Sequence, residues 1–171
     1  LMMFLTFASF ALDGFANACE AIVGEAYGKR DRRSMQNAVA VSTVWAGLTA
    51  SVFCLVFAVF GDGIINLMTD VEEVRATART YLPYAVLMPL AGVWSFQLDG
   101  IFIGTTRGRD LRNAMLISTV IYLPTSYLLW LAMGNHGLWI ALFVLFILRA
   151  LTLWARYPRL IREAQTEATS V

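Results

Sequence analysis

The stretch AVAVSTVWAGLTASVFCLVFAVF, residues 38–60, decides the fold because it contains no charged side chain. A helix rises 1.5 Å per residue, so about 20 residues cross the roughly 30 Å hydrocarbon core of a bilayer. A continuous apolar run of this length does not fit the short, alternating strands of a membrane barrel. The stretch therefore predicts a transmembrane helix.

Four further runs of similar character occur, at Leu1 to Gly24, Tyr81 to Thr106, Ala114 to Met133 and Gly137 to Ala155. The whole chain of 171 residues is 58% hydrophobic and 15% charged, whereas soluble domains are about a quarter charged. We expect an all-α membrane protein with the lipid bilayer as its surroundings. Its five transmembrane helices are predicted at about 1–27, 37–60, 77–107, 112–133 and 137–156, with a cytoplasmic tail at 157–171.

The connection between the second and third runs is itself partly apolar. Residues 64–68 and then Val71 and Val74 supply hydrophobic side chains, and Glu72 and Glu73 follow the cap candidates Thr69 and Asp70. This pattern predicts a short interfacial helix that continues into the third membrane helix.

Basic residues alternate from one connection to the next, which predicts the orientation by the positive-inside rule. The connection between the second and third helices has only Arg75 and Arg79, and the short turn 134–137 has none. We therefore expect the first helix to run inward, the C-terminus to be cytoplasmic, and the protein to lie in the inner (plasma) membrane. Ten basic residues follow the first, third and fifth helices: Lys29, Arg30, Arg32, Arg33, Arg107, Arg109, Arg112, Arg156, Arg159 and Arg162.

The composition also excludes some partners and cofactors. The charges are too few to form a large basic face, so no nucleic-acid partner is expected. Cys19 and Cys54 lie in apolar runs without the Cys and His spacing of a zinc site. We expect no cofactor and no bound metal, apart from the coupling ion considered below.

The beginning of the sequence favours a piece of a longer protein. Leu1 already lies in an apolar run, and neither an initiator Met nor a basic leader precedes that run. We expect a C-terminal piece.

Charged side chains within the predicted membrane helices are the main candidates for function, because an ionised carboxylate there costs several kcal/mol on insertion scales unless it faces a cavity or partner. Asp13, Asn17 and Glu20 have the i, i+4, i+7 spacing of one helix face. Asp99 is the only charge of the third run and follows Gln97 closely. These four polar residues, with Gln97 and Arg149 as weaker members, are the predicted ion-coupling or substrate-binding set.

Counting from the basic loops places Glu20 and Asp99 at about the same depth, with Asp13 further outward. Two such carboxylates could share a proton or a monovalent cation such as Na⁺. The alternative is a structural role, with hydrogen bonds to a neighbouring helix or a pair with Arg149. For Arg149 we favour an extended side chain that reaches the cytosolic surface.

Three segments resemble the multidrug and toxic compound extrusion (MATE) transporters, in their DinF-like branch. They are LDGFANACEA at 12–21, GEAYGKRD at 24–31 and VWSFQLDGIFIGTTRGRDLRNAM at 93–115. The resemblance implies helices 8–12 of a twelve-helix, two-lobe transporter, that is, part of the C-terminal lobe. It also implies export of amphipathic or cationic organic compounds in exchange for H⁺ or Na⁺ by alternating access.

Residue roles implied by this resemblance centre on Asp99. It matches an acidic residue of the tenth helix that belongs to the cation site in sodium-coupled relatives. The partner carboxylate on helix seven and the proton-coupling Asp of the N-terminal lobe lie outside this chain. The implied partners are therefore a small drug-like molecule and the missing N-terminal lobe of the same polypeptide.

Two other functions remain as alternatives. A lipid-linked oligosaccharide flippase of the same superfamily would tend to line its cavity with cationic residues, whereas carboxylates predominate here. A membrane-embedded phosphotransferase would need several closely spaced Asp residues, but Asp13 and Asp99 are solitary, and no catalytic motif accompanies His136. We expect a transporter and not an enzyme.

Overall fold

Six helices make up the computed structural model, which describes residues 1–166. Five of them are long and apolar enough to cross a membrane, as predicted. In chain order the helices are α1 (Met2–Gly28), α2 (Arg32–Met68), α3 (Glu72–Gly104), α4 (Gly108–Met133), α5 (Asn135–Trp154) and α6 (Tyr157–Thr166).

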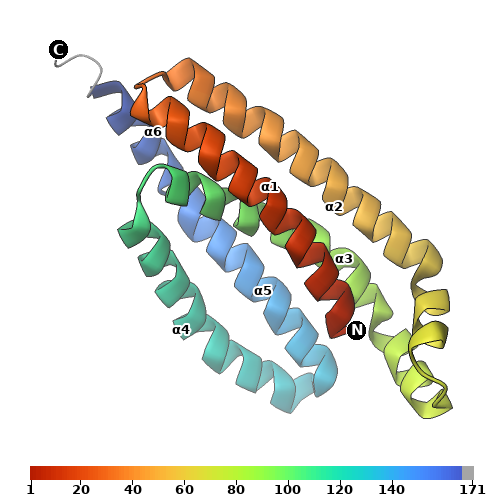
Figure 1. Cartoon of the computed structure of the whole chain (residues 1–171). Helices are drawn as coiled ribbons and strands as arrows, with labels where there is room; N and C mark the ends of the chain where they lie inside the picture. Colours follow the sequence, from red (N-terminus) through yellow and green to blue (C-terminus); the bar gives the residue numbers. More distant parts are fainter. Residues whose placement is uncertain (167–171) are drawn as a thin grey trace.

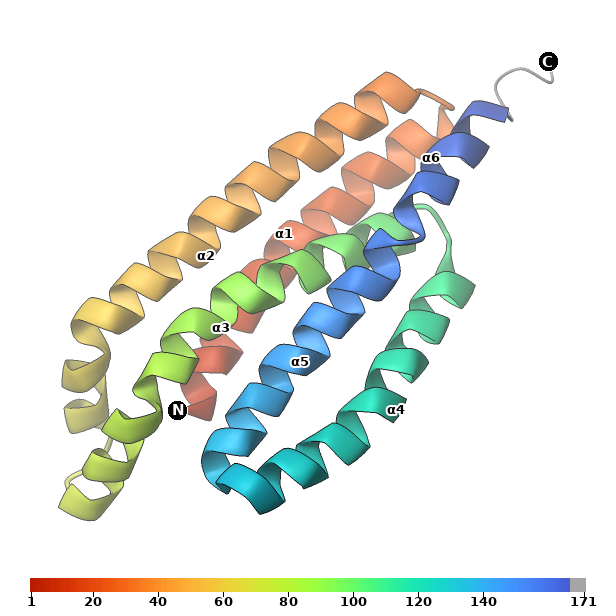
Figure 2. The same cartoon turned by 180° about the vertical axis from the view of Figure 1, so that it is seen from behind.

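The long helices run up and down, with α3 in the middle (Figures 1 and 2). Helices α1, α2 and α5 each pack along α3, and α4 packs mainly along α5. The described residues form no strand. The all-α expectation is therefore confirmed, and α1, α3 and α5 point in one direction while α2 and α4 point in the other.

The connection between α2 and α3 differs from the prediction. Helix α3 begins at Glu72 and runs unbroken through Tyr81, as expected for a helix that continues into the third membrane helix. Helix α2, however, continues to Met68, so residues 64–68 belong to α2, and both helices extend beyond the expected ends at 60 and 77. The physical reason is Arg75, which donates hydrogen bonds to the carbonyls of Asn66 (2.9 Å) and Thr69 (2.7 Å). These bonds satisfy carbonyls that the end of α2 leaves without helical partners.

Two other connections have local causes. Asp31 caps α2, accepting hydrogen bonds from the backbone N–H (3.0 Å) and the hydroxyl (2.6 Å) of Ser34. The cap allows α2 to begin at Arg32, earlier than the expected 37. Gly134 has a φ of +59°, which glycine adopts readily, and this residue makes the tight turn between α4 and α5.

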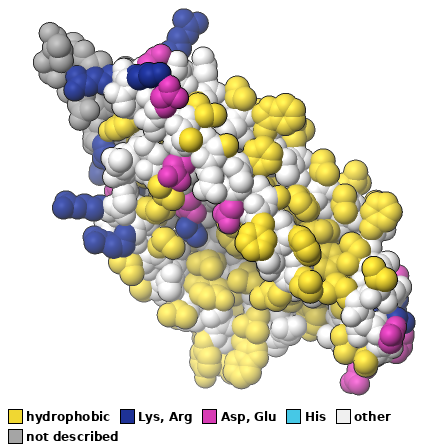
Figure 3. All heavy atoms as spheres, viewed as in Figure 1, with side chains coloured by type: hydrophobic (Ala, Val, Ile, Leu, Met, Phe, Trp, Pro, Cys, Tyr) yellow, Lys and Arg dark blue, Asp and Glu magenta, His cyan; other side chains and the backbone are white. Residues whose placement is uncertain are grey.

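The surface is apolar around its middle and charged at its ends (Figure 3). Large hydrophobic side chains such as Trp45, Leu55 and Leu128 are more than half exposed. Lys and Arg side chains gather at the end near the C-terminus, and a second charged group marks the α2–α3 turn (Figure 3). This surface suits a protein surrounded by lipid, with one strongly basic end.

Candidate functional site

The contact between α1 and α3 sets the depth of every candidate residue. A Cβ atom added to Gly100 would lie 2.3 Å from the carbonyl oxygen of Ala16, and one added to Gly104 would lie 2.4 Å from that of Glu20. Only glycine allows the two backbones to approach so closely. Because both contacts have the same offset along the two chains, the parallel helices keep one register, with Gly100 level with Ala16.

Asp99 forms an ion pair with Arg149 of α5. Arg149 Nη2 lies 2.6 Å from Asp99 Oδ2, and Arg149 Nε donates a hydrogen bond of 3.2 Å to Asp99 Oδ1. The side chain of Asp99 is only 13% exposed, and that of Arg149 is 24% exposed. The expectation that Arg149 extends to the cytosolic surface is therefore wrong, because a partly buried carboxylate on the neighbouring helix binds the Nε–Nη2 edge of its guanidinium group.

The register brings Asp13, not Glu20, closer in depth to Asp99. Asp99 is level with residue 15 of α1, about 3 Å along the axis from Asp13 and about 7.5 Å from Glu20 at 1.5 Å per residue. Asp13 therefore lies at nearly the depth of the Asp99–Arg149 pair. The expectation that Glu20 and Asp99 share one depth is therefore wrong, since the loop count could not include the close glycine contact.

The polar stripe of α1 faces away from the core. Asp13 and Asn17 are exposed and Glu20 is partly buried. Leu12, Ala16 and Cys19, each one residue earlier, form the adjacent, buried face of the helix. Exposed polar groups at membrane depth need a polar partner or water. This stripe and the Asp99–Arg149 pair therefore form the candidate site, and the side chains of Asp13 and Asn17 remain open to a further element or to a ligand.

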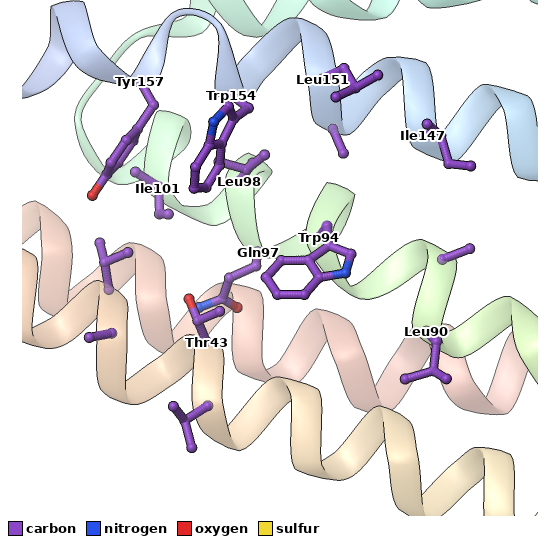
Figure 4. A pocket seen from close by; sticks show the side chains of 15 residues that line it. Thr43, Leu90, Trp94, Gln97, Leu98, Ile101, Ile147, Leu151, Trp154 and Tyr157 are labelled. Atoms are coloured by element: carbon purple, nitrogen blue, oxygen red, sulfur yellow. The ribbon is translucent and has the colours of Figure 1, made fainter.

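Gln97 has a different environment from Asp99. Its side-chain Nε2 donates a 2.6 Å hydrogen bond to the hydroxyl of Ser42 on α2, and Gln97 is 3% exposed. Gln97 lies beside the space between α2 and α5 (Figure 4). The structure thus separates this weaker candidate from the ion pair, and its hydrogen bond holds α2 against α3.

Sequence reasoning missed two features of the site. The spacing of Gly100 and Gly104, with three residues between them, is the GxxxG signal of close helix packing and could have been read from the sequence. The Ser42–Gln97 hydrogen bond had no sequence signal, because a single Ser in a long apolar helix commonly bonds its own backbone. Among the described side chains, those of residues 1–162, no group of three or more His, Cys, Asp or Glu is placed to hold a metal ion.

Comparisons with known proteins agree with one another. The family model described as MatE matches residues 1–128. DNA damage-inducible protein F of Escherichia coli (strain K12) is 41% identical over 163 residues, which cover 93% of this chain and 35% of that protein. The crystal structure of the eukaryotic MATE transporter AtDTX14 matches with a TM-score of 0.77 at 20% identity, over 97% of this chain and 40% of the other. The chain thus spans about a third of the curated relative.

Proposed function

Because this chain belongs to the MATE family of membrane transporters and is a multi-pass membrane protein, we propose that it is part of a secondary active efflux antiporter. The proposed cargo is an amphipathic or cationic organic compound, and the proposed counter-ion is H⁺ or Na⁺. In this proposal the chain supplies helices 8–12 of twelve, and the N-terminal lobe of the same polypeptide completes the substrate path.

The observation that carries the proposal is the partly buried Asp99–Arg149 pair beside the polar stripe of α1. Arg149 engages both carboxylate oxygens of Asp99. A proton on Asp99, or a Na⁺ ion on the same oxygens, competes with the guanidinium group and releases α5 from α3. Ion binding then changes a contact between two packed helices, as alternating access requires.

The basic end of the chain faces the cytoplasm in this proposal, and the protein lies in the inner (plasma) membrane. Ten of the thirteen basic residues lie at that end or in the tail, which supports the orientation. Helices α1, α3 and α5 then run from outside to inside, and the C-terminus is cytoplasmic.

Asp99→Asn in the full-length protein tests the function. The neutral amide keeps the size of the carboxyl group, but a proton or a Na⁺ ion can no longer compete with Arg149 for a carboxylate there. Cells should therefore lose resistance to amphipathic organic cations. Glu73→Gln at the exposed start of α3 is the matched control. Resistance equal to wild type at equal membrane expression would remove Asp99 from the mechanism.

A further inference from the structure

A groove of about 740 Å³ lies between α2 and α5, with α3 as its floor. It is on the face away from α1 (Figure 2), and so away from the polar stripe. Its walls are mainly apolar and aromatic, as the close view shows for Leu90, Trp94, Leu151 and Trp154 (Figure 4). Gln97 is a polar lining residue, but Ser42 already accepts its hydrogen bond. The groove therefore suits a hydrocarbon chain better than a polar ligand.

The length of the groove matches one leaflet of a bilayer. Its floor on α3 extends from Leu90 to Ile101, which is about 16 Å at 1.5 Å per residue. The hydrocarbon core is roughly 30 Å thick. Since Tyr157 of α6 lines one end of the groove, this end lies toward the basic end of the molecule, and the other end lies near the middle of the membrane.

Arg32 supplies a cation beyond that end. It precedes Val39, which lines the groove, by seven residues of α2, so the two share a helix face about 10 Å apart. The Nε atom of Arg32 is buried and has no hydrogen-bond partner within the described part of the chain. Arg32 as a whole is partly exposed, and a planar guanidinium group is well suited to a phosphate oxygen. Arg159 of α6 is exposed at the same end of the molecule.

We propose that this groove binds an anionic phospholipid of the adjacent leaflet. One acyl chain lies along α3 between Trp94 and Trp154, and the phosphate accepts hydrogen bonds from Arg32. The stacked rings of Trp154 and Tyr157, 6.0 Å apart, lie at the level where the chain joins the headgroup, as amphipathic aromatic residues do in membrane proteins. This lipid site does not depend on the transport reaction.

Native mass spectrometry of the full-length protein in detergent, with added dioleoyl phosphatidylglycerol or dioleoyl phosphatidylcholine, tests the headgroup. We expect the anionic lipid to bind about fivefold more tightly, the factor that one basic residue contributes at a membrane surface. Arg32→Gln should remove that preference. Arg109→Gln, which removes an equal charge from the exposed start of α4, should keep the preference.

Two substitutions to Phe test the groove. Ala40→Phe adds a ring to the exposed side of a lining residue and should weaken phosphatidylglycerol binding, and Ala150→Phe on the opposite wall should do the same. Ala132→Phe adds equal bulk to the exposed face of α4 and should leave binding unchanged.

Three results would overturn the proposal. The first is equal binding of the two lipids, or no binding of either lipid. No binding is also the outcome if another helix of the full-length protein fills the groove. The second is the same loss with Arg32→Gln as with Arg109→Gln, which would reflect net charge alone. The third is unchanged binding in either groove variant. Elution as a monodisperse peak on size exclusion checks the fold of each variant.

Discussion

Gly104→Ala tests the close contact that sets the register of α1 and α3. The added Cβ atom would lie 2.4 Å from the carbonyl oxygen of Glu20, and an ordinary contact begins at 3.4 Å, so the helices must separate by about 1 Å at this point. The obstacle is backbone and cannot rotate away. Overpacking of this kind costs about 1–3 kcal/mol.

The measurement is the thermal unfolding midpoint of the full-length protein in detergent. The shift per kcal/mol falls with chain length and is at most about 2 °C for a chain longer than about 250 residues, so Gly104→Ala should lower the midpoint of the full-length protein by a few degrees. Gly47→Ala in α2 is the matched control, because nothing lies within 4 Å of the Cβ atom that it adds. Since Ala is the better helix former by about 0.5–1 kcal/mol, Gly47→Ala should leave the midpoint unchanged or raise it.

Gly104→Ala should also weaken transport, because separating α1 from α3 moves the polar stripe away from Asp99. Equal midpoints for the Gly104 and Gly47 variants would refute the close contact. A lowered midpoint with full transport would leave the contact in place but remove its connection to the site.

Three further predictions use the same unfolding assay. Arg149→Gln leaves Asp99 partly buried without its partner and should lower the free energy of unfolding by about 3 kcal/mol. Adding Asp99→Asn should recover at least half of this loss, and no recovery would mean that the two residues are not coupled. Because Ser34 donates side-chain and backbone hydrogen bonds to Asp31, the pKa of that carboxyl lies below its usual range. The stabilising cap is then complete at neutral pH and is lost only as the pH falls through the lowered pKa, below about 4. Asp31→Ala should therefore lower the unfolding midpoint at pH 7 but not in stronger acid. An equal effect at both pH values would contradict the cap. Gly61→Ala should cost less than Gly104→Ala, since its Cβ would meet the flexible side chain of Leu82 at 2.9 Å and not backbone; an equal cost would contradict this distinction.

The long runs of uncharged, mainly apolar residues predicted the membrane helices well. A run such as 38–60 must satisfy its backbone internally in lipid, and a helix is the structure that does so within one segment. The ends of helices were less predictable where tertiary contacts decide them. Residues 61–68 continue α2 because Arg75, from the next helix, binds its last carbonyls, and no local pattern announces that contact.

The candidate site shows the same division. The membrane carboxylates could be listed from the sequence because charge in an apolar run is conspicuous. Their partners could not, since the choice of Arg149 between Asp99 and the surface depends on how α5 packs against α3. The relative depth of Glu20 and Asp99 likewise depends on where Gly104 lets α1 approach, which loop counting cannot determine.

Ion coupling through Asp99 is the central claim, and ion-driven uptake by proteoliposomes tests it most directly. Full-length protein would be reconstituted, and uptake of ethidium would be followed after a pH gradient or a Na⁺ gradient is imposed. Wild type should accumulate ethidium under at least one gradient, and Asp99→Asn should show no gradient-driven accumulation under either. Accumulation by Asp99→Asn at the wild-type rate would contradict the account.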